Sequence, residues 1–212
     1  MKKSISEKLG MITLAGSVLM VSCSPLIEES IDPQLVKSSE ALVVPGSSGD
    51  LNARKSTEVA YFERFTNQLT QLDEHGNWTA VNPTFFPGTG IGNSSHMGKA
   101  LTFLNQRTDR LGTVGAPVTQ FYSEQLEALG IFVDNLEVSS VTTDGKGNSV
   151  WFKNIQNIAS PISEERIEFK AEVEIIGGTG KFEGASGSAT VDGFFNPTNG
   201  QGMSTIKGNM LY

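Results

Sequence analysis

The chain has 212 residues, 38% of them hydrophobic and 18% charged, with a formal net charge of −7 at pH 7. This composition excludes an intrinsically disordered chain and is typical of one soluble domain with a hydrophobic core, while the acidic balance makes nucleic acid an unexpected partner. The 23 glycines exceed the average of roughly 7%, which indicates many turns and favours an all-β fold.

Residues 1–22 have the pattern of an export signal peptide. Three lysines lie within the first eight residues, and an apolar run follows at residues 9–21. The run has the length of a signal-peptide core and is short for crossing a bilayer. We therefore expect this segment to be removed on export.

The apolar run ends in LMVSC, which resembles the lipobox of bacterial lipoproteins. Met20 stands where leucine is commonest, Ser22 is small, and Cys23 is the only cysteine in the chain. The resemblance implies that Cys23 becomes the mature N-terminus and carries acyl chains such as palmitate. These would hold the protein in the bacterial cell envelope, at the outer membrane, through lipid alone. The alternative is a buried thiol in a membrane or core helix, which fits poorly with a cysteine at the end of the run.

Residues 23–56 predict a flexible, disordered tether. They are rich in serine, proline and acidic residues, and PGSSGD at residues 45–50 is typical of linkers. Glu28 and Glu29 resemble the acidic signals that send lipoproteins to the outer surface in Bacteroidetes-type bacteria, and a solvated linker explains them equally well. With Cys23 lipidated, residues 57–212 have no cysteine for a disulfide or a metal, so packing must stabilise this domain.

Residues 58–106 predict mainly strands. The β-branched and aromatic content of residues 58–72, followed by the turn HGNW at residues 75–78, favours the strands of a hairpin over a helix. Residues 85–106 then predict a glycine-rich loop that feeds a strand around Phe103. Because this strand is apolar on both faces, we expect it to be covered on both faces.

Residues 117–129 predict the one helix. Pro117 suits its first turn and Gly130 is placed to terminate it. A single short helix of this kind is expected to plug or cover one end of a barrel. Residues 136–155 predict a hairpin about a turn at residues 144–148, and residues 202–212 predict the last strand.

The clearest hairpin spans residues 165–195. From Ile167 to Ile175, every second residue is apolar and the residues between them are charged, which is the period of a strand with one buried face. Three glutamates, Glu168, Glu172 and Glu174, are expected on its solvated outer face. The positive-φ positions of the following turn are expected at three glycines, Gly177, Gly178 and Gly180.

About eight strands joined by short turns favour a closed antiparallel β-barrel with one short helix, because closure removes exposed strand edges. The interior of such a barrel is either filled by side chains or able to hold one small ligand. A filling by Phe103, Phe169, Ile175 and Phe182 would leave no cavity.

Three stretches together resemble bacterial exported proteins with the allene oxide cyclase-like barrel. They are NSSHMGKA at residues 93–100, VTTDGKGNSVWF at residues 141–152 and, most specifically, IIGGTGKFEGASGSATVDG at residues 175–193. Over residues 57–212 the resemblance implies a calycin-like, eight-stranded antiparallel barrel, as in plant allene oxide cyclases and dirigent proteins. It implies no catalytic or binding residue, because no counterpart of the sites in those proteins is found here.

The same resemblance implies a homo-oligomer, a trimer. Phe194 and Phe195 place one aromatic ring on each face of their strand, and one of these rings could lie at such an interface. A ring packed under the helix or under a loop is the alternative.

Motifs for common chemistries fail in this chain. GGTGK is not a phosphate loop, because Ile175 and Phe182 stand where a glycine and a serine or threonine belong. Ser186 lacks the spacing of a hydrolase nucleophile. Of the two histidines, which lie in different elements, His96 beside the glycine-rich loop is the candidate ligand-binding residue, with hydrogen bonding to a loop backbone as its simpler role. We expect no catalytic residue, no metal and no cofactor.

These patterns favour a noncatalytic, lipid-anchored barrel domain that binds a small apolar ligand or a surface macromolecule. Two alternatives stay open. One is a cyclase- or isomerase-like enzyme acting on an apolar substrate inside the barrel, for which fold-level analogy is the only support. The other is a structural or assembly protein that acts through an oligomer interface. An enzyme or a binding protein would need an interior cavity with a few convergent polar groups, so the barrel interior decides.

Overall fold

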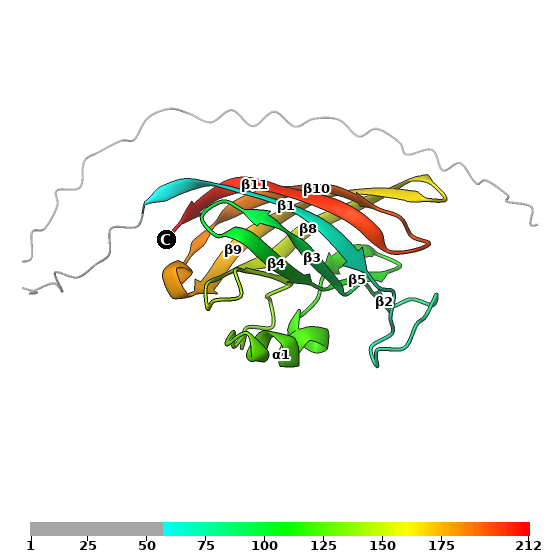
Figure 1. The fold of residues 1–212 in the computed structure, drawn as a ribbon. Coiled ribbons are helices and arrows are strands. Elements are labelled where there is room, and N and C mark those ends of the chain that lie inside the picture. The colour runs from blue at the N-terminus through cyan, green and yellow to red at the C-terminus, as the bar shows by residue number, and fades with distance from the viewer. Residues whose placement is uncertain (1–56) are drawn as a thin grey trace, which may run out of the picture. The chain divides into compact units, whose positions relative to one another are not determined.

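A computed structural model describes residues 57–212, which form a closed antiparallel β-barrel (Figure 1). The predicted fold class is therefore confirmed. The predicted signal peptide, the predicted lipidation of Cys23 and the predicted tether fall on residues outside those described. Within residues 57–212, no helix has the length and apolarity needed to cross a membrane.

Eight strands form the ring. They are β1 (Glu58–Leu69), β3 (Gly88–Ser94), β4 (Gly98–Leu104), β7 (Ser140–Thr143), β8 (Ser149–Ser163), β9 (Arg166–Thr179), β10 (Ser186–Phe195) and β11 (Gln201–Leu211). Their order around the barrel is β8–β7–β4–β3–β1–β11–β10–β9, and β9 pairs with β8 to close it. Three short strands, β2 (Thr84–Phe85), β5 (Gln106–Asp109) and β6 (Gly112–Gly115), extend from β8, where β6 pairs with it at Asn157.

β1 is one twelve-residue strand that pairs with β11 and β3. The predicted local hairpin was wrong, because only two isolated bridges, from Leu72 to Trp78 and from Leu72 to Phe85, span the turn at residues 75–78 in the described chain. The partner of β1 is instead the last strand of the protein, which no local pattern can reveal. Four alternate residues of β1 are buried in the barrel, Tyr61, Glu63, Phe65 and Asn67.

The segment predicted as a glycine-rich loop is the strand β3. A Cβ atom at Gly90 would lie 2.3 Å from Oδ1 of Asn67, and one at Gly92 would lie 2.0 Å from the carbonyl oxygen of Arg64. These glycines are therefore needed because groups of the neighbouring strand occupy the space of a side chain. The loop prediction failed because glycine here permits close approach rather than chain reversal.

A β-bulge at Ile155 reverses the two faces of β8. The pairing with β9 shifts register between Asn154 and Gln156, so Ile155 has no partner in the ladder. Asn154 lines the interior before the bulge, whereas Asn157 and Ala159 line it afterwards. One extra residue thus turns Asn157 inward, as bulges commonly re-aim side chains.

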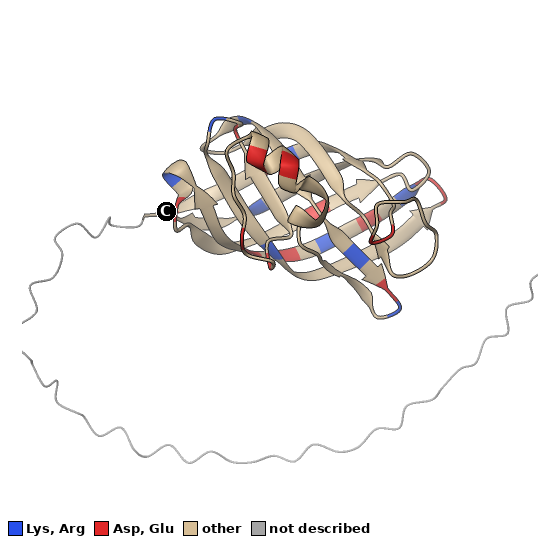
Figure 2. Ribbon diagram, turned by 90° about the horizontal axis from the view of Figure 1, so that it is seen from below, with Lys and Arg blue, Asp and Glu red and all other residues tan. Residues whose placement is uncertain are grey.

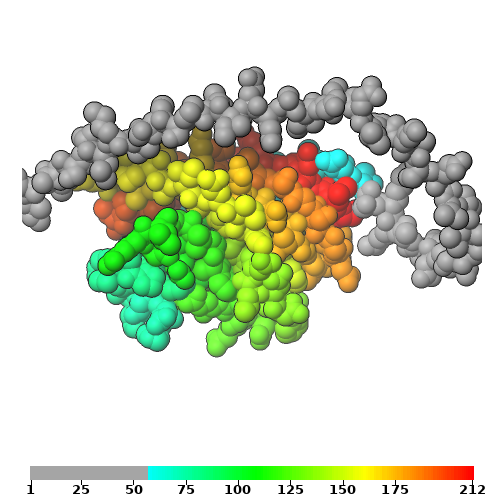
Figure 3. Space-filling view, turned by 180° about the vertical axis from the view of Figure 1, so that it is seen from behind, coloured from blue at the N-terminus to red at the C-terminus, as the bar shows by residue number. Residues whose placement is uncertain are grey.

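The helix α1 (Thr119–Ala128) confirms the predicted helix, and Gly130, with a φ of 73°, follows its end. It covers the outer wall of the barrel, however, and not one end. Leu126 packs there with Phe103 of β4 and Val141 of β7. Figure 1 shows α1 outside the ring, and Figure 3 shows this green segment beneath the yellow and orange strands β8 and β9. β4 is therefore covered on both faces, as predicted, but Phe103 lies outside the barrel.

The turn between β9 and β10 begins later than predicted. Gly177 and Gly178 lie within β9, and the prediction of positive φ at these two residues was wrong. Gly180 does have a positive φ of 63°, and it opens the 3-10 turn η1 (Gly180–Phe182). Gly178 is needed for another reason, since a Cβ atom there would lie 2.3 Å from the carbonyl oxygen of Ser149.

The other predicted turn and the last strand are confirmed. The turn at residues 144–148 joins β7 to β8, with a hydrogen bond from the amide of Asp144 to the carbonyl oxygen of Asn148 at 3.2 Å. Glu168, Glu172 and Glu174 are exposed on the outer face of β9 as predicted. Figure 2 shows acidic and basic residues interspersed along the strands and turns.

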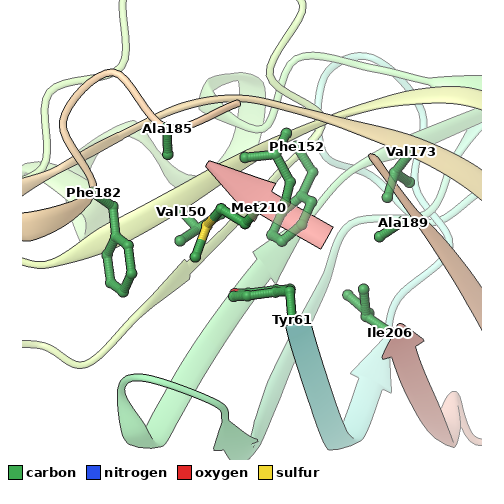
Figure 4. Packing of buried hydrophobic residues seen from close by; sticks show 10 residues of the cluster. Tyr61, Val150, Phe152, Val173, Phe182, Ala185, Ala189, Ile206 and Met210 are labelled. Atoms are coloured by element: carbon green, nitrogen blue, oxygen red, sulfur yellow. The ribbon is translucent and has the colours of Figure 1, made fainter. Parts of the chain in front are cut away.

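One half of the barrel interior is solid. Its side chains form a continuous apolar cluster (Figure 4), made of Tyr61, Val150, Phe152, Val173, Ile175, Phe182, Ala185, Ala189, Ile206 and Met210. We call this set the solid half. Ile175 and Phe182 therefore do fill the interior, but the filling stops partway along the barrel.

Candidate functional site

The other half of the barrel is hollow. It contains a cavity of about 220 Å³. Val173 and Ile206 belong both to the solid half and to the cavity lining, so they mark its floor. Because a cavity of about 150 Å³ binds benzene, this one is large enough for a small one- or two-ring molecule.

Aromatic rings surround the rim of the cavity. The ring centroid of Phe195 lies 6.3 Å from that of Phe86 and 6.5 Å from that of Phe169, and all three residues are only half-buried. Phe194 points the other way, with the Arg166 guanidinium 3.9 Å above its ring. The two rings thus lie on opposite faces, as predicted. The rim can contact a planar apolar molecule at favourable aromatic distances.

Four asparagine side chains give the cavity its polar groups. Their Oδ1 atoms are buried and have no hydrogen-bond partner among the described residues, and all four residues line the cavity: Asn67, Asn105, Asn154 and Asn157. Buried polar groups are normally paired, since leaving one unpaired costs about 1–3 kcal/mol. Unpaired acceptors that line a cavity therefore indicate a place for a ligand or for ordered water.

The orientation of the Asn105 amide is fixed by its neighbours. Its Nδ2 donates to the carbonyl oxygen of Pro117 at 3.0 Å and to Oε1 of Gln120 at 3.2 Å. The Pro117 carbonyl can only accept, so exchanging nitrogen and oxygen would place two acceptors together. Asn105 is fully buried, and its Oδ1 remains an acceptor without a donor.

Asn154 and Asn157, which are both on β8, lie beside Asn105. The backbone amide of Asn154 donates to Oγ of Ser139 at 2.9 Å, and the backbone amide of Asn105 donates to the carbonyl oxygen of Ser139 at 2.8 Å. Nδ2 of Asn157 donates to Oε1 of Gln106 at 2.9 Å. These contacts bring three of the unpaired acceptors to one side of the cavity. We call Asn105, Asn154 and Asn157 the asparagine wall.

Asn67 faces this wall from the opposite side of the barrel. It lies on β1, which is four strands from β8 in either direction around the ring. Its Nδ2 donates to Oγ of Ser204 at 2.9 Å. Asn67 has the same parity along the chain as the buried Tyr61 and Phe65, a signal that was present in the sequence. The asparagine wall was missed because the bulge and the β4–β5 junction were not foreseen.

A buried carboxyl group lies close to the cavity floor. Glu63 has no exposed surface, and the Tyr61 hydroxyl donates to its Oε1 while Oγ1 of Thr142 donates to its Oε2 at 3.1 Å. Ser94 donates to the Tyr61 hydroxyl at 3.2 Å. We call these four residues the Glu63 cluster. Glu63 itself is not among the residues that line the cavity.

Burial changes the protonation of this cluster. Burial raises the pKa of Glu63 from 4.5 to about 7, although the hydrogen bonds from Tyr61 and Thr142 oppose the rise. Burial also raises the pKa of Tyr61 above its ordinary value, and the neighbouring Glu63 carboxylate adds to that rise. Glu63 is therefore largely protonated below neutral pH, since burial penalises the charged form.

The structure places His96 away from the cavity. It lies in the turn between β3 and β4, at the end of the barrel that contains the solid half, and has a φ of 68°. Its Nε2 lies 2.9 Å from the carbonyl oxygen of Ala60, and its ring packs against Tyr212. These contacts agree with the simpler role considered for His96, which is hydrogen bonding to the protein backbone. His75 is exposed in a different loop, and Gly177, Gly178 and Gly180 also lie outside the cavity lining.

Among residues 57–212, no group of three or more histidine, cysteine or acidic side chains is arranged to hold a metal ion. Comparison with protein-family models, with curated proteins and with solved structures found no match to the chain. The closed eight-stranded barrel is compatible with a calycin-like fold.

Proposed function

We propose that this protein is a lipid-anchored barrel domain of the bacterial cell envelope that binds a small, uncharged and largely apolar molecule in the hollow half of its barrel. The observation that carries this proposal is the lining of the cavity. Its walls combine aromatic and aliphatic side chains with a few amides and hydroxyls, which is the usual composition of a small-molecule site.

The lining favours binding over acid–base catalysis. In the part of the chain that the structure describes, none of the residues lining the cavity is ionisable. A general acid or base must lie within hydrogen-bond reach of its substrate, directly or through one water. Glu63, whose pKa is shifted toward neutrality, lies beneath the lining and is already bonded to Tyr61 and Thr142. The same absence of charge argues that the ligand is neutral, because a buried ion without a partner is costly.

A tryptophan at the rim should block the cavity. Ala159 is exposed, lines the cavity and follows the bulge of β8. In Ala159→Trp, the affinity for benzofuran, a neutral planar probe, is expected to fall at least about tenfold, because the indole ring would occupy part of a volume that holds only a small molecule. An NMR titration of the full domain measures this affinity.

The matched control is Ser160→Trp. Ser160 is the next residue of β8 and is also exposed. It lines a groove on the outside of the barrel beside Arg166 and Phe194, so the same bulky side chain would leave the cavity free. We expect its benzofuran affinity to stay within twofold of the original protein. Equal affinities in the two variants, or no binding of benzofuran and of its N–H analogue indole to the original protein, would contradict the proposal of a ligand site in the barrel.

The membrane anchor is tested separately. The LMVSC sequence and the serine-rich segment that follows it support lipidation at Cys23. We expect Cys23→Ser to lose incorporation of radioactive palmitate in a bacterial host, whereas Ser24→Ala should keep it. Palmitate labelling that persists in Cys23→Ser would rule out this anchor without affecting the ligand site.

A further inference from the structure

The hollow half has an imbalance between hydrogen-bond donors and acceptors. Three Nδ2 groups already donate to protein atoms, those of Asn67, Asn105 and Asn157. All four buried Oδ1 atoms are left without donors in the described chain. Of the four Nδ2 groups, only that of Asn154 has no acceptor in the described chain, so these asparagines offer the cavity four acceptors against one donor.

No hydroxyl group of the lining donates to these four oxygens, because none of the four has a hydrogen-bond partner in the described chain. Oγ of Ser139 donates to the carbonyl oxygen of Phe152 at 3.2 Å and accepts from the amide of Asn154. The hydroxyls of Thr108 and Thr113 bond to each other at 2.9 Å. Each of these groups already has a partner near the asparagine wall, so none is committed to an asparagine oxygen.

We propose that the ligand is a neutral, largely apolar molecule that presents an O–H or N–H donor to the asparagine wall. This inference rests on the proposed ligand site and adds the chemistry of the ligand. A carboxylate, an ether or a ketone brings only acceptors, so it would leave the asparagine oxygens unpaired and add its own unpaired atoms. An alcohol, a phenol or an indole-like N–H satisfies Asn154 or Asn157 while its apolar body contacts the aromatic rim.

Water is the competing occupant of the polar side. Ordered water could donate to the same oxygens, and a ligand that displaces it must replace those hydrogen bonds to bind well. A ligand with a donor replaces the hydrogen bonds of the displaced water, whereas a ligand of the same shape without a donor leaves the asparagine oxygens unpaired. The site should therefore discriminate between such ligands.

Indole and benzofuran form a matched pair for this test, because they share shape and differ in an N–H against an ether oxygen. In NMR titrations of the full domain, we expect indole to bind about tenfold more tightly than benzofuran. This difference corresponds to one hydrogen bond to an otherwise unpaired buried acceptor. Ala159→Trp should weaken both probes. Equal binding of the two probes, with both blocked by Ala159→Trp, would overturn the donor inference and leave the ligand site standing.

Substitution of the asparagine wall tests whether its oxygens accept the hydrogen bond from the ligand. In Asn154→Leu/Asn157→Leu, the preference for indole over benzofuran should fall from about tenfold to within about twofold, while benzofuran binds at least as well as before. Gln156→Leu, an exposed position between them on the same strand, is the control and should keep the preference. If the double variant does not fold, Asn154→Leu alone is used, since no hydrogen bond of its side chain holds another residue. A preference that survives substitution of the wall would overturn the assignment.

Discussion

Replacement of Glu63 by glutamine is expected to make the protein about 3 kcal/mol more stable above pH 7, with little change below pH 4.5. The reason is the pKa of Glu63, which burial raises from 4.5 to about 7. Between these two values the unfolded chain has released a proton that the folded barrel still holds. The free energy of unfolding therefore falls as the pH rises through this window, by about 1.4 kcal/mol for each unit of pKa difference.

Glutamine should fit the same space. Its Oε1 can accept from the Tyr61 hydroxyl as Glu63 does, and its Nε2 can donate to Thr142, whose hydroxyl is able to reverse its role. Urea unfolding at several pH values measures the difference between the two proteins. Glu172→Gln, at an exposed position of β9, is the control and should follow the original protein closely. Parallel pH profiles for Glu63→Gln and the original protein would mean that Glu63 does not retain its proton on folding.

The second large effect is expected from Phe152→Ala, which should lower the free energy of unfolding by about 3–5 kcal/mol. Phe152 is 1% exposed in the solid half, and its ring lies 5.9 Å from that of Tyr61. Truncation removes buried apolar surface and leaves a void that the rigid ring of strands cannot close. Urea unfolding at one pH measures the loss.

Phe132→Ala is the matched control for this substitution. Phe132 is 70% exposed, so its truncation should change stability by less than about 0.5 kcal/mol. Similar unfolding midpoints for the two variants would show that the solid half is not the main source of stability. The benzofuran affinity of Phe152→Ala, measured under native conditions, should remain, because Phe152 does not line the cavity.

The sequence predicted the ring of strands because the relevant signals are local. The alternation from Ile167 to Ile175, the turn at residues 144–148 and the helix before Gly130 all appear in the structure as expected. Each depends on residues that are neighbours in the chain. Where the signal depended on a distant partner, as for β1 with β11 or for the glycines of β3, the prediction failed.

The candidate site was harder to predict from the sequence for the same reason. Tyr61, Glu63 and Asn67 could be placed on one face of a strand, but whether that face was solid or hollow depended on side chains from every other strand. Asn105 acquires its role from Pro117 and Gln120. His96 was favoured because it stands beside the predicted glycine-rich loop, which is the strand β3 in the structure. A polar residue on an otherwise apolar, buried face was the one informative signal.

The bulge at Ile155 decides which residues of β8 line the cavity. Upstream of it, even-numbered residues look into the barrel, and downstream the odd-numbered residues do. Without this bulge, a β8 of the same sequence would turn Gln156 and Ile158 toward the cavity in place of Asn157 and Ala159. The residues of β8 in the solid half, Val150 and Phe152, precede the bulge, so a change in the bulge would alter the cavity lining and leave these two side chains in place.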